Sequence, residues 1–364
     1  MTTLTKTRVI DADAHVVETA HTWDYMDPSE MKYRPTLVQV PGEVKQQLWL
    51  IDGNFRGATF PAFTPEQLAR MSTLRGRRFE TDRDASEMTN VDLRLKHMDE
   101  SGADVQVLHT TLFLAPVSDK VAVEVALCKS YNRWLADVWK QGGGRLRWST
   151  VLPLLSIPDA IDLMRFAKEN GAVAVLIRPI EASRLIFDPY FYPIYEEASR
   201  LDMAIAVHIG NGSMVLRELS RHPQIEAQAF HTGRIPTVAA VHDLVMSEVP
   251  KAFPKLRFAF IEASAAWMPW IWDELKKRFS GIGRDWPEDL AKEYNIWVTC
   301  ENTDDLPYII SRCGDDSLLI GTDYGHTDPS SDLDAIKVFA SRSDISDETK
   351  RKVMTDNPIE LYAL

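Results

Sequence analysis

The feature that most constrains the fold is an alternation of short apolar runs with longer stretches of helical spacing, which continues along the whole chain. Such alternation is typical of βα units that build a parallel sheet. Eight runs have the character of strands, at residues 8–12, 104–109, 147–152, 172–177, 204–208, 257–261, 295–299 and 317–321. Eight units predict a (β/α)8 barrel of the α/β class, because an open doubly wound sheet usually has fewer strands and a glycine-rich first turn. No GxGxxG sequence follows the first run.

The length of the chain is compatible with one large unit. Barrels commonly exceed 250 residues as one domain, so we expect the 364 residues to form a single domain over 1–364. The one long interruption of the βα pattern lies at about residues 16–88, after the first strand. Within it, residues 47–54 have the pattern of a strand that runs into a turn. We therefore predict a small β-containing insertion that caps the barrel mouth, with oligomer contact as the alternative use.

Composition excludes several classes of partner. The formal net charge is −12, and a field of this sign repels the phosphates of nucleic acid. Three widely spaced cysteines fit neither a disulfide framework nor a zinc knuckle, which predicts a reducing compartment. The N-terminal residues turn acidic at Asp11 before a signal-peptide core could form, and no later apolar run approaches a membrane span. We expect a cytoplasmic protein that acts on a small molecule and has no nucleic-acid or membrane partner.

Polar residues gather at the ends of the predicted strands, which is where the catalytic residues of such barrels lie. The first strand leads into Asp11-Ala-Asp13-Ala-His15, and a period of two predicts that these three polar side chains share one face. One such residue alone is usually a hydrogen-bonded structural residue, but together these nitrogen and oxygen donors predict a metal-ligand set. The later strands lead into further candidates, at His208, Glu262, Glu301, Asp323 and His326.

These residues, taken in order, give the chain a resemblance to a known family. The chain resembles the amidohydrolase superfamily, in particular the amidohydrolase-2 branch that includes the aminocarboxymuconate-semialdehyde decarboxylase-like proteins. The resemblance covers nearly the whole chain, and the order and spacing of its segments make it specific. The segments that carry it are residues 9–15 with Glu18 following, 94–102, 177–179, 188–195, 206–208, 253–258, 321–326 and 356–362.

The resemblance implies a metal site that holds one or two divalent ions. Carried over by position, it makes His15, His208 and Asp323 metal ligands. Asp13 stands where the family usually has the first histidine of its HxH pair. A carboxylate there favours manganese or iron relative to an all-nitrogen set, although zinc remains feasible.

Further site residues follow from the same comparison of motifs. Glu262 stands where many decarboxylases of this branch carry a catalytic histidine; a carboxylate there can bridge a second metal, act as a base or orient a ligand. His231 falls near another family histidine and is a candidate second-metal ligand or acid. Arg178 suits a substrate carboxylate through bidentate pairing, or forms a salt bridge in the barrel rim. Other candidates for the substrate pocket, each with packing as its alternative, are Glu301, His326 and Trp23.

Three functional hypotheses remain open from the sequence. The first is metal-dependent hydrolysis of a carbonyl-type bond, with Asp323 or Glu262 taking the proton of the attacking water. The second is non-oxidative decarboxylation of an aromatic or enoic acid; the missing histidine after the sixth strand weakens it, although His231 or His242 could supply a proton. The third is a binding protein without chemistry, against which the nearly complete ligand set argues. Barrels of this branch are often dimers, so we expect a homodimer.

Overall fold

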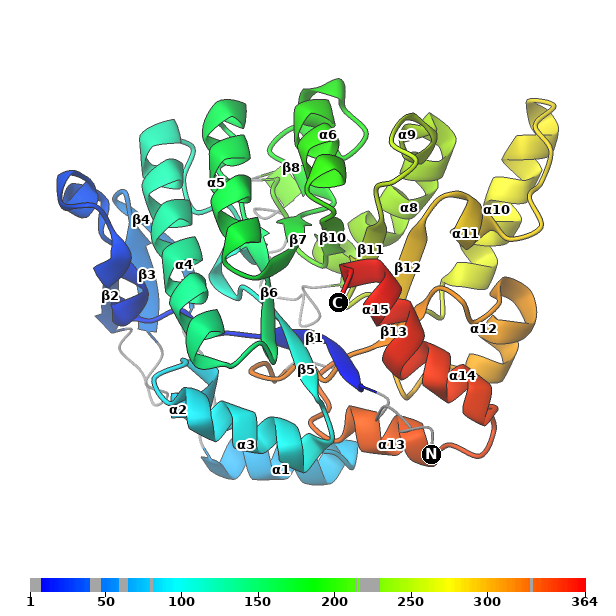
Figure 1. Ribbon diagram of the computed structural model, residues 1–364, viewed down its shortest axis with the longest axis horizontal. Helices are drawn as coiled ribbons and strands as arrows, with labels where there is room; N and C mark the ends of the chain where they lie inside the picture. Colours follow the sequence, from blue (N-terminus) through cyan, green and yellow to red (C-terminus); the bar gives the residue numbers. More distant parts are fainter. Residues whose placement is uncertain are drawn as a thin grey trace, which may run out of the picture.

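The computed structural model describes residues 8–39, 47–58, 65–78, 81–213, 215–216, 230–327 and 330–364. Eight parallel strands form one sheet and curve into a barrel with helices outside it (Figure 1). The predicted (β/α)8 fold is confirmed, with every predicted strand in place. In sheet order the strands are β1 (Ile10–His15), β5 (Val105–His109), β6 (Leu146–Val151), β7 (Ala172–Ile177), β10 (Ala204–His208), β11 (Phe258–Ile261), β12 (Ile296–Cys300) and β13 (Leu318–Ile320).

The barrel closes between β1 and the segment that follows β13. Ala14 forms a parallel bridge with Tyr324, and the His15 backbone N–H donates to the Tyr324 carbonyl at 2.7 Å. The C-terminal helix α15 (Asn357–Tyr362) covers the end at which the strands begin, where the Tyr362 hydroxyl donates to the Ala12 carbonyl at 3.0 Å. This end is therefore packed, and the opposite end is left for the polar residues.

Small and branched aliphatic side chains, together with Trp297, fill the interior of the barrel, into which roughly every second residue of the buried strands points. They form a cluster separate from the larger core that lies between the strands and the helices. Its strand members are Ile10, Ala12, Val105, Val107, Val173, Ala174, Ala204, Ala206, Ala259, Ile261, Trp297 and Leu319.

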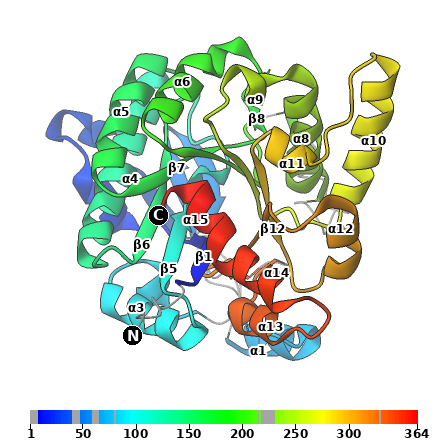
Figure 2. The same cartoon turned by 45° about the vertical axis from the view of Figure 1, so that its right-hand side comes forward.

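Helices follow the strands and cover the outside of the barrel (Figures 1 and 2). Gly102 ends the first long barrel helix with a φ of +90°, a conformation that favours glycine. None of the described helices is long and apolar enough to cross a bilayer. The helices are α3 (Val91–Ser101), α4 (Val121–Gln141), α5 (Ile157–Glu169), α6 (Tyr192–Arg200), α8 (Ile235–Ser247), α9 (Val249–Ala252), α10 (Met268–Gly281), α11 (Leu290–Glu293), α12 (Leu306–Cys313), α13 (Ala335–Ser341) and α14 (Asp347–Arg351).

The insertion after β1 contains a three-stranded antiparallel sheet, as the sequence predicts. Strands β3 (Gln47–Ile51) and β4 (Asn54–Ala58) join through Asp52 and Gly53, whose positive φ values of 49° and 76° make a hairpin turn. β3 also pairs with β2 (Thr36–Gln39), and helices η1 (Ala20–Tyr25), η2 (Pro28–Tyr33), α1 (Pro65–Arg75) and α2 (Arg83–Ser86) complete the insertion. A Cβ on Gly57 would come within 3.0 Å of Leu112, so β4 packs closely on the loop that follows β5.

Candidate metal centre

A β-bulge at the end of β1 decides which of its acidic side chains face the barrel mouth. Between Asp11 and Ala14, β1 advances three residues while its partner β5 advances two, so one extra residue is accommodated. The prediction that Asp11, Asp13 and His15 share one face is therefore wrong. Asp11 instead bonds to Gln106 and Thr322, which lie on the two neighbouring segments. The bulge turns Asp13 and His15 toward the other strand ends.

Five predicted ligands converge at this end of the barrel. His15 Nε2 lies 3.4 Å from Asp323 Oδ1, 3.5 Å from Asp13 Oδ1 and 3.7 Å from Glu262 Oε2. His208 Nε2 lies 3.5 Å from Asp13 Oδ1 and 3.6 Å from Glu262 Oε2. Ligand atoms about 2.1 Å from a shared ion are separated by about 3.0 to 3.4 Å in octahedral or tetrahedral arrangements. The observed separations are close to that spacing.

The histidine tautomers present lone pairs to the centre of this group. His15 Nδ1 is 2.9 Å from the Thr110 carbonyl, and His208 Nδ1 is 3.0 Å from the Ile209 carbonyl. A carbonyl only accepts, so each Nδ1 carries the hydrogen and each Nε2 keeps its lone pair. Burial, together with neighbouring His326, lowers the pKa of His15 well below its usual range, which keeps the ring neutral. Neutral imidazole with a free Nε2 is the form that ligates metals.

The residues present fit a divalent cation. Three buried ligand atoms make no hydrogen bond: Asp13 Oδ1, His15 Nε2 and His208 Nε2. A buried polar atom without a hydrogen bond destabilises the folded state by about 1 to 3 kcal/mol. A divalent cation would satisfy all three atoms and offset two of the three negative charges of the converging carboxylates of Asp13, Glu262 and Asp323. Two imidazole nitrogens with carboxylate oxygens suit zinc, iron or manganese.

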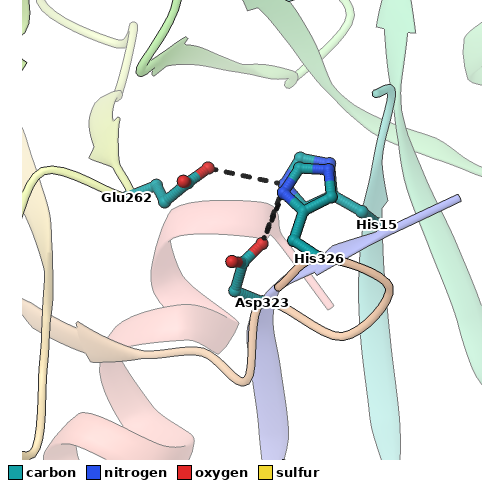
Figure 3. A group of neighbouring side chains, drawn as sticks. All are labelled: His15, Glu262, Asp323 and His326. Atoms are coloured by element: carbon teal, nitrogen blue, oxygen red, sulfur yellow. Dashed lines mark ion pairs between the residues drawn. The ribbon is translucent and has the colours of Figure 1, made fainter. Parts of the chain in front are cut away.

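His326 joins this group from the loop after β13. Its Nδ1 lies 2.9 Å from Asp323 Oδ1, and its ring stacks on that of His15 with centroids 3.7 Å apart. In Figure 3 the carboxylates of Glu262 and Asp323 approach these overlapping rings from two sides. The predicted pocket residue His326 is thus in direct contact with the ligand group.

Two of the carboxylates stand on strained backbone. Glu262 has a φ of +62° and Asp323 a φ of +49°, a region that residues other than glycine rarely adopt. Hydrogen bonds hold both conformations: the Glu262 N–H donates to Thr299 Oγ1 at 2.7 Å, and the Asp323 N–H donates to the Asp13 carbonyl at 2.9 Å. Strain of this kind collects at functional sites, where neighbouring structure enforces it.

Two serines that sequence reasoning missed also contact the carboxylates. Ser331 donates to Asp323 Oδ2 at 2.6 Å, and Ser330 donates to Glu262 Oε1 at 3.1 Å. Each hydrogen bond turns one carboxylate oxygen outward and leaves the other directed at the imidazoles. The sequence signal was weak, since it consisted only of two hydroxyl residues in the loop after the last strand.

The structure does not bring the other predicted residues into this group. Arg178 makes a bidentate ion pair with Glu181, which is the salt-bridge alternative. Glu301 pairs with the Arg234 guanidinium at 2.9 Å. Trp23 is fully buried and packs edge to face on Trp49 at 5.7 Å.

The predicted acids from the segment after β10 also lie elsewhere. His231, in the π-helix η5 (Phe230–Arg234), lines a mainly apolar cavity of about 290 Å³ together with Pro179 and Ile235. His242 lies on α8 with its Nδ1 3.1 Å from Asp243. Neither histidine belongs to the group of possible metal ligands among the described residues.

His109, at the end of β5, lies beside the ligand group. Its ring centroid is 5.0 Å from that of His208, and its Nδ1 bonds to Ser149 Oγ at 2.9 Å. Burial lowers the pKa of His109 to about 3, so the ring is neutral. It therefore adds a polar wall to the site without adding charge.

Comparison with known proteins agrees with this geometry. A family profile described as amidohydrolase, of the amidohydrolase-2 type, matches residues 10–364. The chain belongs to the amidohydrolase family. This amidohydrolase is 22% identical to a 2-amino-3-carboxymuconate-6-semialdehyde decarboxylase of Dictyostelium discoideum over 294 residues, 75% of this chain and 76% of that protein. The match identifies the chain as an enzyme of the amidohydrolase superfamily, as its motifs predict.

Solved structures share the fold of this amidohydrolase. An amidohydrolase from Mycobacterium avium subsp. paratuberculosis K-10 aligns with a TM-score of 0.76 and 20% identity, over 99% of this chain and 98% of that one. The 5-carboxyvanillate decarboxylase from Sphingomonas paucimobilis aligns with a TM-score of 0.63 and 17% identity, over 99% of this chain and all of that one. At such identities the likeness establishes the barrel and leaves the reaction to the site.

Proposed function

We propose that this amidohydrolase is a metal-dependent, non-oxidative decarboxylase of an aromatic or enoic carboxylic acid. Relatives named as decarboxylases support the reaction class. The observation in this chain that carries the proposal is the contact of His326 Nδ1 with Asp323 Oδ1, 2.9 Å apart within the group of possible ligands. Decarboxylation needs a proton at the carbon that loses CO₂, and this pair can hold one there.

The hydrogen bonds of His326 define where that proton is held. Thr111 Oγ1 donates to the Val16 carbonyl at 2.7 Å, so the same oxygen accepts from His326 Nε2–H at 3.0 Å. With Nε2 already protonated, a second proton on the ring resides at Nδ1, against Asp323 Oδ1. The Asp323 carboxylate stabilises that protonated ring. The transferable proton is thus held on His326 Nδ1, which donates it in a hydrogen bond to Asp323 Oδ1.

The chemistry follows from these positions. The divalent ion would be held by five residues: Asp13, His15, His208, Glu262 and Asp323. When bound, it supplies positive charge that attracts a substrate carboxylate and a neighbouring substrate oxygen. The bond between the carboxylate carbon and its neighbour breaks, CO₂ leaves, and the electron pair stays on the neighbouring carbon. The proton on His326 Nδ1 then forms the new C–H bond, and His326 is left neutral. No water is consumed in this step.

Hydrolysis of a carbonyl-type bond is the second candidate, since the same carboxylates can accept a proton from water. Its specific support is the position of Glu262, whose Oε2 lies 3.6 to 3.7 Å from both imidazoles, where a base would stand. Decarboxylation ranks first because the relatives that carry an activity name favour it.

Isotope labelling and CO₂ measurement distinguish the two reactions. Metal-loaded protein is incubated in D₂O with a panel of hydroxybenzoates and unsaturated acids, and CO₂ release and deuterium at the vacated carbon are measured. We expect both, with His326→Gln lowering kcat at least 100-fold and the control His231→Gln leaving it near wild type. A second incubation uses esters and lactones in ¹⁸O-labelled water. Carboxylic acid products that carry ¹⁸O, with no CO₂ released from any of the acids, would instead establish the hydrolase.

A further inference from the structure

A row of buried polar side chains lies next to the candidate metal ligands, at the seam where β1 closes the barrel between β5 and the segment after β13. It consists of Arg94 on α3, Gln106 on β5, Asp11 on β1 and Thr322 after β13, each no more than 1% exposed. None of the four belongs to the candidate ligand group. We call these four residues the seam network. Charged groups this deeply buried need a full set of partners, so their contacts are informative.

The contacts of the seam network form a continuous chain. Asp11 Oδ1 accepts the Thr322 N–H at 2.9 Å, and Asp11 Oδ2 accepts the Thr322 hydroxyl at 2.6 Å and the Gln106 amide nitrogen at 2.8 Å. Gln106 Oε1 accepts Arg94 Nε–H at 2.7 Å. The glutamine amide therefore stands between a carboxylate and a guanidinium, with its donor toward the first and its acceptor toward the second. This order fixes the orientation of the amide.

The seam network touches the backbone of the ligands at both of its ends. Arg94 Nη2 donates to the His15 carbonyl at 3.2 Å, and its guanidinium lies 3.6 Å from the centre of the Tyr324 ring. At the other end, the N–H groups of Thr322 and Asp323 both donate to the Asp13 carbonyl, at 3.1 and 2.9 Å. Thr322, which Asp11 holds by two hydrogen bonds, immediately precedes the strained ligand Asp323.

We propose that Asp11 is a positioning residue for the cation site. Through Thr322 it holds Asp323 in its left-handed conformation and keeps Asp13 in register with it, while Gln106 donates a hydrogen bond to the buried carboxylate and is itself held by Arg94. The inference concerns cation binding and not the reaction, so failure of the decarboxylase assay would leave it unaffected. A network that only stabilises the barrel would change the free energy of unfolding but not the metal affinity of the folded protein.

The test measures the Kd of the folded, metal-free protein for Zn²⁺ and for Mn²⁺, by competition with a chromogenic chelator at 20 °C. Asp11→Asn keeps the size of the side chain but presents an amide group to donors that need an acceptor. We expect its Kd to rise about 10- to 100-fold, the range found when partners of metal ligands are lost. Far-UV circular dichroism confirms that the variant is folded.

A double variant tests the same chain of contacts by rescue. Asp11→Asn combined with Gln106→Glu exchanges the amide and the carboxylate: Asn donates to the new glutamate, which pairs directly with Arg94, and Asn Oδ1 still accepts the Thr322 N–H. We expect its Kd to return to within about threefold of wild type. A double variant that binds as weakly as Asp11→Asn overturns the proposal.

Two further variants serve as an independent test and as a control. Thr322→Val removes one hydroxyl and leaves the acid in place, and we expect its Kd to rise severalfold even where Asp11→Asn does not fold. Asp315→Asn is the matched control, because Asp315 also accepts a threonine hydroxyl at 2.6 Å, from Thr349. It lies before β13, at the other end of the strand, and should leave the Kd unchanged. Wild-type Kd values in Asp11→Asn or in folded Thr322→Val refute the positioning role.

Discussion

Removing the charge of Glu262 should raise the free energy of unfolding of the metal-free protein. It should also weaken metal binding, so the same substitution should lower the free energy of unfolding when metal is bound. The ligand atoms of Glu262 and Asp323 lie within 4.8 Å of each other. Without a cation, two like charges at that distance repel and lower the free energy of unfolding. Glu262→Gln removes one charge while keeping nearly the same shape. With a cation bound, the same substitution removes a ligand.

The magnitude follows from Coulomb's law. At an effective dielectric constant of about 20, two unit charges 4.8 Å apart repel by about 3.5 kcal/mol. Unfolding entropy of about 2.1 cal/mol/K per residue gives roughly 0.76 kcal/mol/K for 364 residues. The ratio predicts that Glu262→Gln raises the melting temperature in EDTA by about 5 °C. The loss of a charged ligand should lower the affinity for Zn²⁺ or Mn²⁺ at least tenfold.

The assay is thermal unfolding at pH 8, in EDTA and in excess metal. Glu301→Gln is the matched control, since Glu301 follows the next strand and pairs with Arg234 rather than with the ligand group. It should melt at a lower temperature under both conditions and bind metal as wild type does. A Glu262→Gln protein that melts below wild type in EDTA would refute the argument that uncompensated charge destabilises the site.

Three other predictions concern the fold around the site. Tyr362→Phe removes the hydrogen bond to the buried Ala12 carbonyl and should lower the free energy of unfolding by about 1 to 2 kcal/mol in urea, with metal affinity unchanged. Burial raises the pKa of Glu124 to about 7, so the folded state favours its uncharged form. The stability of wild type relative to Glu124→Gln should therefore fall as pH rises from about 4.5 to 7, by up to about 3 kcal/mol, in urea titrations across that range. Trp23→Ala should destabilise by about 3 to 5 kcal/mol, because Trp23 is fully buried; a loss under 1 kcal/mol would show that the insertion does not pack as described.

Local patterns in the sequence were sufficient to predict the barrel and most of the ligand types. The strand at 172–177 and that at 204–208 match β7 and β10 residue for residue, because continuous β-branched and aliphatic runs mark strands buried on both faces. His208, Glu262 and Asp323 each follow such a run, and parallel strands bring their carboxyl ends to one face of a barrel. The position of each of these ligands therefore depends mainly on where its own strand ends.

The residues that were misplaced depend on longer-range contacts. His231 comes 23 residues after the end of β10, and it lines an apolar cavity with residues from after β7. Arg178 was equally able to bind a substrate or pair with an acid, and the short hairpin of β8 (Ile180–Glu181) and β9 (Arg184–Leu185) supplies Glu181 three residues later. Nothing in the spacing of these residues specifies which neighbour they meet.

The sequence by itself determined the number and order of the strands and the kinds of ligand at their ends, because hydrophobic periodicity is a local property of the chain. The tertiary structure alone decided that Asp13 and His15 face the cation site while Asp11 turns away. That choice arises from a β-bulge, and the bulge exists because β1 must pair with β5 on one side and close against Tyr324 on the other. Register between segments some 300 residues apart is set by closure of the whole barrel.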